Sequence, residues 1–165
     1  MRRNTAWIMV AALLSTSCAG PVRQNFGGVG AAPVRTVMVA PAARQDSAWP
    51  QVEAALHDGG IAVADDAGAE LEFAVGARPA SMALAGAAQS GAKKQRLLQS
   101  CADTTYRVVM ALTDRASGKV LARGWAEEAH CHADRATVVP TLAQRAVAMM
   151  VAPVAAGESL RQTRD

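Results

Sequence analysis

Short apolar runs and one periodic segment mark the folded part of the chain from residue 36 onward. Pro41, paired glycines and the polar turn Asp65–Gly68 interrupt these runs, so each run predicts a short strand. Trp49, Val52 and Leu56 recur at helical spacing and predict a helix that packs on a sheet. The predicted elements are strands at residues 36–40, 61–64 and 71–76, and a helix that Asp46 or Ser47 caps and Gly59–Gly60 ends.

The clearest pattern is a β-hairpin. Tyr106–Thr113 and Val120–Glu127 are strand-forming segments on either side of the polar segment Asp114–Lys119. Asp114 at the start of this segment and Gly118 near its end suit a tight turn in which Gly118 takes a positive φ.

A second helix follows the hairpin. Pro140 suits a first helical turn and Pro153 a stop, so we predict a regular helix from about Val139 to Ala152 whose apolar side covers the sheet. Residues 77–100, with their prolines and glycines, predict an irregular insertion. The order β-α-β-β-(insertion)-β-β-α predicts an α+β two-layer sandwich, with a mainly antiparallel sheet and helices on one face.

The first seventeen residues have the pattern of a secretory signal peptide. Arg2 and Arg3 precede the apolar run Ala6–Leu14, and small residues follow it. This run is about half the length of roughly 20 residues that a membrane-spanning helix needs. We therefore predict export and removal of residues 1–17.

The segment before Cys18 resembles a bacterial lipobox, the signal for lipid attachment to a cysteine. It reads LSTSC, with Ser15 where leucine is usual. Ala19 and Gly20 after the cysteine imply the outer membrane, facing the periplasm. The alternative is an ordinary signal peptide that is cut nearby. The predicted organisation is a lipid-anchored flexible tether at 18–34, one domain at 35–153 and a disordered tail at 154–165.

The hairpin also predicts how two cysteines pair. Antiparallel strands pair residues whose numbers have a constant sum, which is 232 or 233 for a turn centred at residue 116 or 116.5. Cys101 and Cys131 add up to 232, so they fall opposite each other and we predict a disulfide. In the chain-entropy model such a bond contributes about 3 kcal/mol. The third cysteine, Cys18, is then the lipidation site.

The alternative is a metal site built from Cys101, His130 and His132, whose thiolate and imidazole groups suit zinc or copper. The two histidines fall on one side of an extended chain, whereas Cys131 between them points to the other side. No CxxC or HExxH spacing accompanies them. The disulfide is therefore preferred, and we predict no metal and no cofactor.

Composition argues against a nucleic-acid partner. Aromatic residues make up only 4% of the chain, and its net charge of +3 falls to +1 without Arg2 and Arg3.

The serines and His57 stand in no pattern typical of a nucleophile or a phosphate site, so we predict that the protein is not an enzyme. Other residues have side chains that could bind a partner or an ion, but simpler roles are predicted for them. Trp125 is predicted to pack on the sheet, and Asp65 and Asp66 to form a turn. The side chains predicted to be solvated are Lys93, Lys94 and Arg96.

Several sequence segments resemble those of a loose group of small Gram-negative envelope lipoproteins with an α+β domain. They are VMVAP, VEAALHDGGIAV, AELEFAVGA and the hairpin YRVVMALTDRASGKVLARGWAE. The group includes auxiliary lipoproteins of ABC-type transport systems and the lipopolysaccharide-assembly lipoprotein. The resemblance implies a non-enzymatic accessory or adaptor that binds another envelope protein. A carrier of a lipid or small hydrophobic ligand is the alternative, and a metal-binding protein is a third. The resemblance carries over no partner-binding residues.

Overall fold

The computed structural model describes residues 22–30, 33–82, 103–131, 133–153 and 160–164. In chain order, the elements are β1 (Val22–Val29), β2 (Thr36–Val39), the 3-10 helix η1 (Ala43–Gln45), α2 (Trp49–Asp58), β3 (Ala62–Val63), β4 (Ala69–Pro79), β5 (Thr104–Asp114), β6 (Val120–His130), α3 (Arg135–Val151) and β7 (Leu160–Arg164). Within these ranges, no helix is long and apolar enough to cross a membrane.

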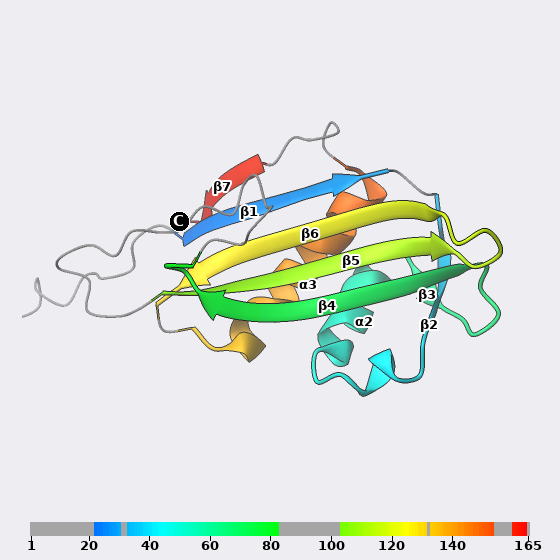
Figure 1. The fold of residues 1–165 in the computed structure, drawn as a ribbon, viewed down its shortest axis with the longest axis horizontal. Coiled ribbons are helices and arrows are strands. Elements are labelled where there is room, and N and C mark those ends of the chain that lie inside the picture. Colours follow the sequence, from blue (N-terminus) through cyan, green and yellow to red (C-terminus); the bar gives the residue numbers. More distant parts are fainter. Residues whose placement is uncertain (1–21, 31–32, 83–102, 132, 154–159, 165) are drawn as a thin grey trace, which may run out of the picture.

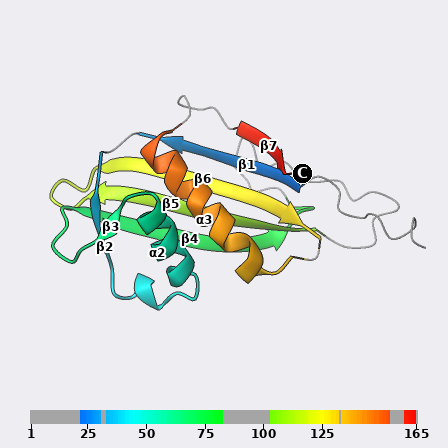
Figure 2. The same ribbon diagram turned by 180° about the vertical axis from the view of Figure 1, so that it is seen from behind.

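The molecule has two layers, a sheet and a pair of helices. The strands lie in the order β3-β2-β4-β5-β6-β1-β7. The five strands from β4 to β7 in this order are antiparallel neighbours, whereas β2 runs parallel to β3 and β4. Both α2 and α3 lie on one face of the sheet, as two opposite views show (Figures 1 and 2). The predicted α+β class, with a mainly antiparallel sheet and helices on one face, is confirmed.

The first strand replaces most of the predicted tether at residues 18–34. β1 pairs with β6 from Gln24 to Val29 and with β7 along its other edge. Phe26 is 3% exposed and belongs to the core. The glycines at 27 and 28 suggest a flexible segment, but they serve here as contact points that allow other groups to approach the strand. The folded domain therefore begins at least as early as Val22.

The predicted disordered tail at 154–165 also contains a strand. β7 pairs with β1 in antiparallel register from Val22–Arg164 to Phe26–Leu160. Its sequence, LRQTR, carries no apolar alternation. Its order comes from backbone pairing with the edge of β1, which local sequence does not reveal.

Helix α2 begins at Trp49, with Pro50 in its first turn and Gly59 as C-cap. The predicted cap is wrong, because the N-cap residue is Ala48, which forms no side-chain capping hydrogen bond. Asp46 instead accepts a hydrogen bond from the N–H of Ala48 at 2.8 Å. Gly60 follows with a φ of 74°.

Helix α3 begins at Arg135, one turn before the predicted start near Val139. Asp134 caps it, since its carboxylate accepts hydrogen bonds from the backbone N–H of Thr137 at 2.8 Å and from its hydroxyl at 2.7 Å. These two hydrogen bonds hold the pKa of Asp134 below its ordinary value. Pro140 therefore lies inside the helix. Because proline has no N–H, the helical hydrogen bond to the carbonyl of Ala136, an exposed residue, is missing.

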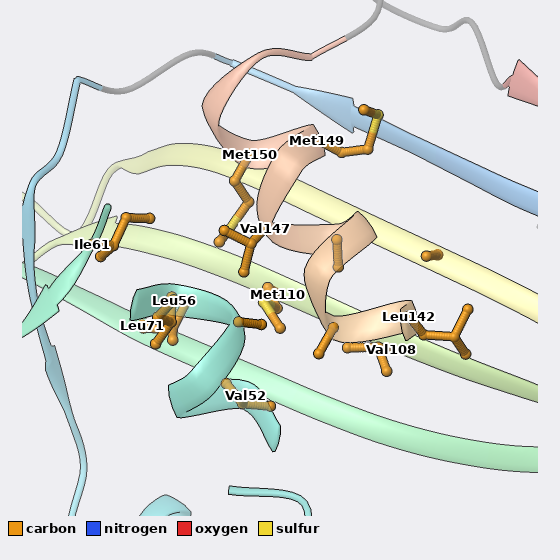
Figure 3. Close-up of a cluster of buried hydrophobic side chains, with 14 of the residues drawn as sticks. Val52, Leu56, Ile61, Leu71, Val108, Met110, Leu142, Val147, Met149 and Met150 are labelled. Atoms are coloured by element: carbon orange, nitrogen blue, oxygen red, sulfur yellow. The ribbon is translucent and has the colours of Figure 1, made fainter. Parts of the chain in front are cut away.

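The core lies between the helices and the sheet (Figure 3). Met150, on α3, is 1% exposed, and Met149 beside it is 8% exposed, so both methionines fill the core. The other large contributors, fully or almost fully buried, are Val52 and Leu56 from α2, Ile61, Leu71 from β4, Val108 and Met110 from β5, and Leu142 and Val147 from α3.

Two glycines allow α3 to lie directly on the backbone of the sheet. Gly28 and Gly124 are paired across β1 and β6. A Cβ atom on Gly124 would collide with the carbonyl oxygen of Ala146, and one on Gly28 with the carbonyl oxygen of Met149. The C-terminal half of α3 thus approaches the sheet more closely than any larger residue permits.

The hairpin of β5 and β6 is longer than predicted, with eleven residues in each strand. Its turn is as expected: Gly118 has a φ of 68° and donates its N–H to the carbonyl of Asp114 at 2.8 Å. The register differs. Thr113 pairs with Val120, but an irregularity after Leu112 brings the remaining pairs, such as Thr104 with His130, to a constant sum of 234.

Candidate functional site

Two adjacent glutamates near the end of β6 are buried on opposite faces of the sheet. Glu127 is 3% exposed and Glu128 is 1% exposed. Successive side chains of a strand point to opposite faces, so Glu128 lies on the face that the helices cover and Glu127 on the other. A buried carboxylate is costly unless polar groups satisfy it, and each of these two has its own set.

On the helix side, Glu128 lies between two partners. Gln24 of β1 donates its side-chain amide to one carboxylate oxygen at 2.5 Å. The Nε2 atom of His130 lies 2.5 Å from the other oxygen and forms an ion pair with it when the imidazole is protonated. Tyr106, opposite Glu128 on β5, donates its hydroxyl to the carbonyl of Ala133 at 3.0 Å. This polar cluster closes the helix-side core at one end of the sheet.

On the other side, Glu127 is held by three strands. Asn25 of β1 donates its side-chain amide to it at 3.1 Å. A guanidinium nitrogen of Arg107 on β5 lies 3.6 Å from its carboxylate, and one of Arg78 on β4 lies 4.0 Å away. Two arginines therefore surround one carboxylate and fix its position.

Trp125 is the neighbour of this network on the same face. Its indole lies against Gly27, where a Cβ atom would come within 3.1 Å of the indole nitrogen. The guanidinium carbon of Arg107 lies 4.8 Å from the centre of its ring. An aromatic ring that covers a cross-strand glycine stabilises a sheet, so Trp125 packs on the sheet as predicted. It is nevertheless only half-buried.

We call this surface the open face: the side chains of β4, β5, β6 and β1 that point away from the helices. No helix among the described residues covers it (Figures 1 and 2). Small residues and larger polar side chains both lie near Trp125 on this surface. By strand register, the members of the open face near Trp125 are Ala74, Gly76, Arg107, Val109, Ala111, Arg123, Glu127, Asn25 and Gly27.

The predicted cysteine and metal residues are only partly within the described residues. Cys18, Cys101 and His132 lie outside them. Cys131 is exposed and disulfide-bonded. The observed pairing ends at Thr104 with His130, and the irregularity at Leu121 of β6 gives these pairs a sum of 234 instead of the predicted 232 or 233. The Cys101–Cys131 pairing stays a prediction.

For the metal alternative, the structure places His130 against Glu128. Within the described ranges, no group of three or more histidine, cysteine, aspartate or glutamate residues has an arrangement that holds a metal ion. His57 is 91% exposed, with Nδ1 3.8 Å from the carboxylate of Asp58. Lys93, Lys94 and Arg96 lie outside the described residues.

Asp65, in the predicted turn, forms an ion pair with Arg44 at 2.5 Å. The side chain of the neighbouring residue, Asp66, is exposed.

Sequence reasoning missed the two glutamate networks. Their partners Gln24 and Asn25 stand about 100 residues earlier, in a segment predicted to be a tether. The one local signal is a pair of acids, Glu127 and Glu128, that follows an apolar stretch of a strand.

Comparisons with known proteins show the fold alone. No family model and no curated protein sequence matches the chain. Two solved structures of PelC dodecamers from Paraburkholderia phytofirmans, one of them a single-substitution variant, are similar in fold at 15% and 12% identity, both with a TM-score of 0.50. They cover 78% and 80% of this chain, and 98% and 99% of their own.

A PDZ domain protein from Parabacteroides distasonis is similar with a TM-score of 0.50 and 11% identity. The match covers 93% of this chain and 42% of that protein. These neighbours are not the lipoprotein groups that the sequence resembles, so that resemblance stays a prediction.

Proposed function

We propose that the protein is an exported, non-enzymatic envelope lipoprotein, anchored through Cys18, that acts as an adaptor and binds a partner protein through its open face. The observation that carries the proposal is the position of Trp125. It lies half-buried in the middle strands of a face that none of the described helices covers, fixed by Gly27 below it and Arg107 beside it.

Tryptophan and arginine are the residues that contribute most often to binding energy at protein interfaces. Arg107 is also tied to Glu127, and Glu127 to Asn25, so the platform is ordered before a partner arrives. A preordered surface loses less conformational entropy on binding than a flexible one.

The interior gives less support to the alternative, a carrier of a lipid or small hydrophobic ligand. Between the described helices and the sheet, the large side chains of Leu56, Met110 and Leu142 are at most 1% exposed and pack together. A ligand in this place would have to displace them.

A second copy of this chain is the second candidate partner. The PelC structures that share the fold over almost their whole length are dodecamers. Self-association through the open face would use the same residues, and the mass of a crosslinked product distinguishes the two cases.

The test places a photoreactive residue at Ala74 or Ala111, both on the open face, in the full chain in its native envelope. A matched control carries it at Ala54, an exposed alanine of α2 in the helix layer. We expect covalent adducts of a single mass from Ala74 and Ala111. We also expect Trp125→Ala to lower their yield at least tenfold, whereas Trp125→Phe, which keeps a ring over Gly27, lowers it less.

Thermal unfolding of each variant establishes that the protein remains folded. Adducts from Ala54 in equal yield, or a yield from Ala111 that does not respond to Trp125→Ala, would contradict the assignment of the open face. An adduct of twice the chain mass would identify the partner as a second copy.

A further inference from the structure

We infer that one end of the sheet lies against a layer of lipid headgroups. This anchor end consists of Pro79 at the end of β4, residues 80–82 after it, and residues 131 and 133–137, which run from the end of β6 through the first turn of α3. The inference rests on the proposed lipidation of Cys18 and adds an orientation to it.

The chain between the proposed lipid anchor and the sheet is short. Only three residues, 19–21, separate Cys18 from Val22, the first residue of β1. An extended chain advances at most about 3.6 Å per residue, so the two α-carbons are no more than about 14 Å apart. The predicted tether of residues 18–34 would have allowed the domain to move several times farther from the membrane.

The topology decides which surface this short link holds near the membrane. β6 is antiparallel to β1, so its last residue, His130, lies at the end where β1 begins. Thr104, the first residue of β5, pairs with His130 and with Pro79, the last residue of β4. Figure 1 shows the start of β1 and the arrowheads of β4 and β6 at one end of the sheet, and the hairpin turn at the other. Strands of eleven residues separate the two ends by roughly 35 Å.

The chemistry of the anchor end fits a headgroup layer. Met82 is 61% exposed, the largest value among the exposed large hydrophobic side chains of the described residues. Arg78 donates a hydrogen bond to its carbonyl oxygen and so ties the segment to β4. An exposed apolar side chain held beside arginines is typical of an interfacial contact.

An exposed arginine lies at this end. Arg135 is the first residue of α3, and its side chain is 45% exposed. It forms an ion pair with Asp46 at 3.3 Å. Because both side chains are exposed, Arg135 can exchange Asp46 for another anion at little cost in free energy. Next to it, the carboxylate of Asp134 accepts hydrogen bonds from Thr137. The guanidinium group of Arg135 at this place suits a lipid phosphate.

The test measures the depth of single tryptophans in acylated protein reconstituted into vesicles of phosphatidylethanolamine and phosphatidylglycerol that contain brominated lipid. In a background of Trp49→Phe and Trp125→Phe, one variant carries Met82→Trp at the anchor end. The matched control carries Ser117→Trp, in the exposed hairpin turn at the far end. We expect quenching of the Met82→Trp fluorescence to be at least threefold greater than that of Ser117→Trp.

A second pair of variants tests the charge. Arg135→Glu is expected to lower the quenching at least twofold in vesicles with phosphatidylglycerol, whereas Lys119→Glu, in the far turn, leaves it unchanged. If the protein floats with the vesicles but both tryptophans are quenched equally, the orientation is wrong and the lipid anchor stands. If the protein does not float with the vesicles at all, the proposed anchor fails, and the orientation with it.

Discussion

Replacing Gly124 by alanine is expected to lower the free energy of unfolding by about 3 kcal/mol, because overpacking in a rigid contact costs this much or more. The added methyl group would collide with the carbonyl oxygen of Ala146 and with the side chain of Met150. The obstacle is mainly helix backbone, so no change of rotamer relieves it. Urea unfolding measures the loss, and we expect the melting temperature to fall by about 10 °C.

Gly76 provides the matched control. It lies in β4, and a Cβ atom there would meet nothing within 4 Å. Gly76→Ala should therefore change the free energy of unfolding by less than about 1 kcal/mol. Equal effects of Gly124→Ala and Gly76→Ala would show that α3 does not lie on the backbone of β6 as described.

The second large effect is expected for Glu128→Ala. Leaving a buried polar group without its partner typically costs about 1–3 kcal/mol, and this substitution affects two such groups. His130 and Gln24 would both lose the carboxylate that they share. Chemical denaturation of this variant and of Glu72→Ala, an exposed glutamate on β4, gives the comparison.

A double-mutant cycle separates the pair from its surroundings. If Glu128 and His130 form a unit, the double variant Glu128→Ala/His130→Ala loses at least about 1 kcal/mol less unfolding free energy than the sum of the two single losses. A loss below about 1 kcal/mol for Glu128→Ala, close to that of Glu72→Ala, would contradict the buried network.

The α+β class, both helices and the central hairpin were predictable from sequence because their signals are local. Helical spacing of Trp49, Val52 and Leu56, and a turn with Gly118, depend on neighbours a few residues away. The first and last strands were not predictable in this way. The glycines of β1 look like a linker unless the helix above them is known, and the polar sequence of β7 is ordered by its pairing partner.

The site follows the same division. Trp125 was identified as a residue that packs on the sheet from the alternation along its strand. The burial of Glu127 and Glu128 depends on side chains of β1, β4 and β5, and on a register that the irregularity after Leu112 sets. Contacts of this kind between distant segments are tertiary, and the pattern of one strand contains no information about them.

We propose that the protein is a lipid-anchored component of the cell envelope. The intact mass of the protein tests this proposal most directly. The protein is isolated from its own host without reductant and weighed before and after thiol alkylation. We predict a mature chain that begins at Cys18, carries acyl mass and gains nothing on alkylation. A chain cut elsewhere without acyl mass would contradict the anchor, and alkylation of Cys101 and Cys131 would contradict their disulfide.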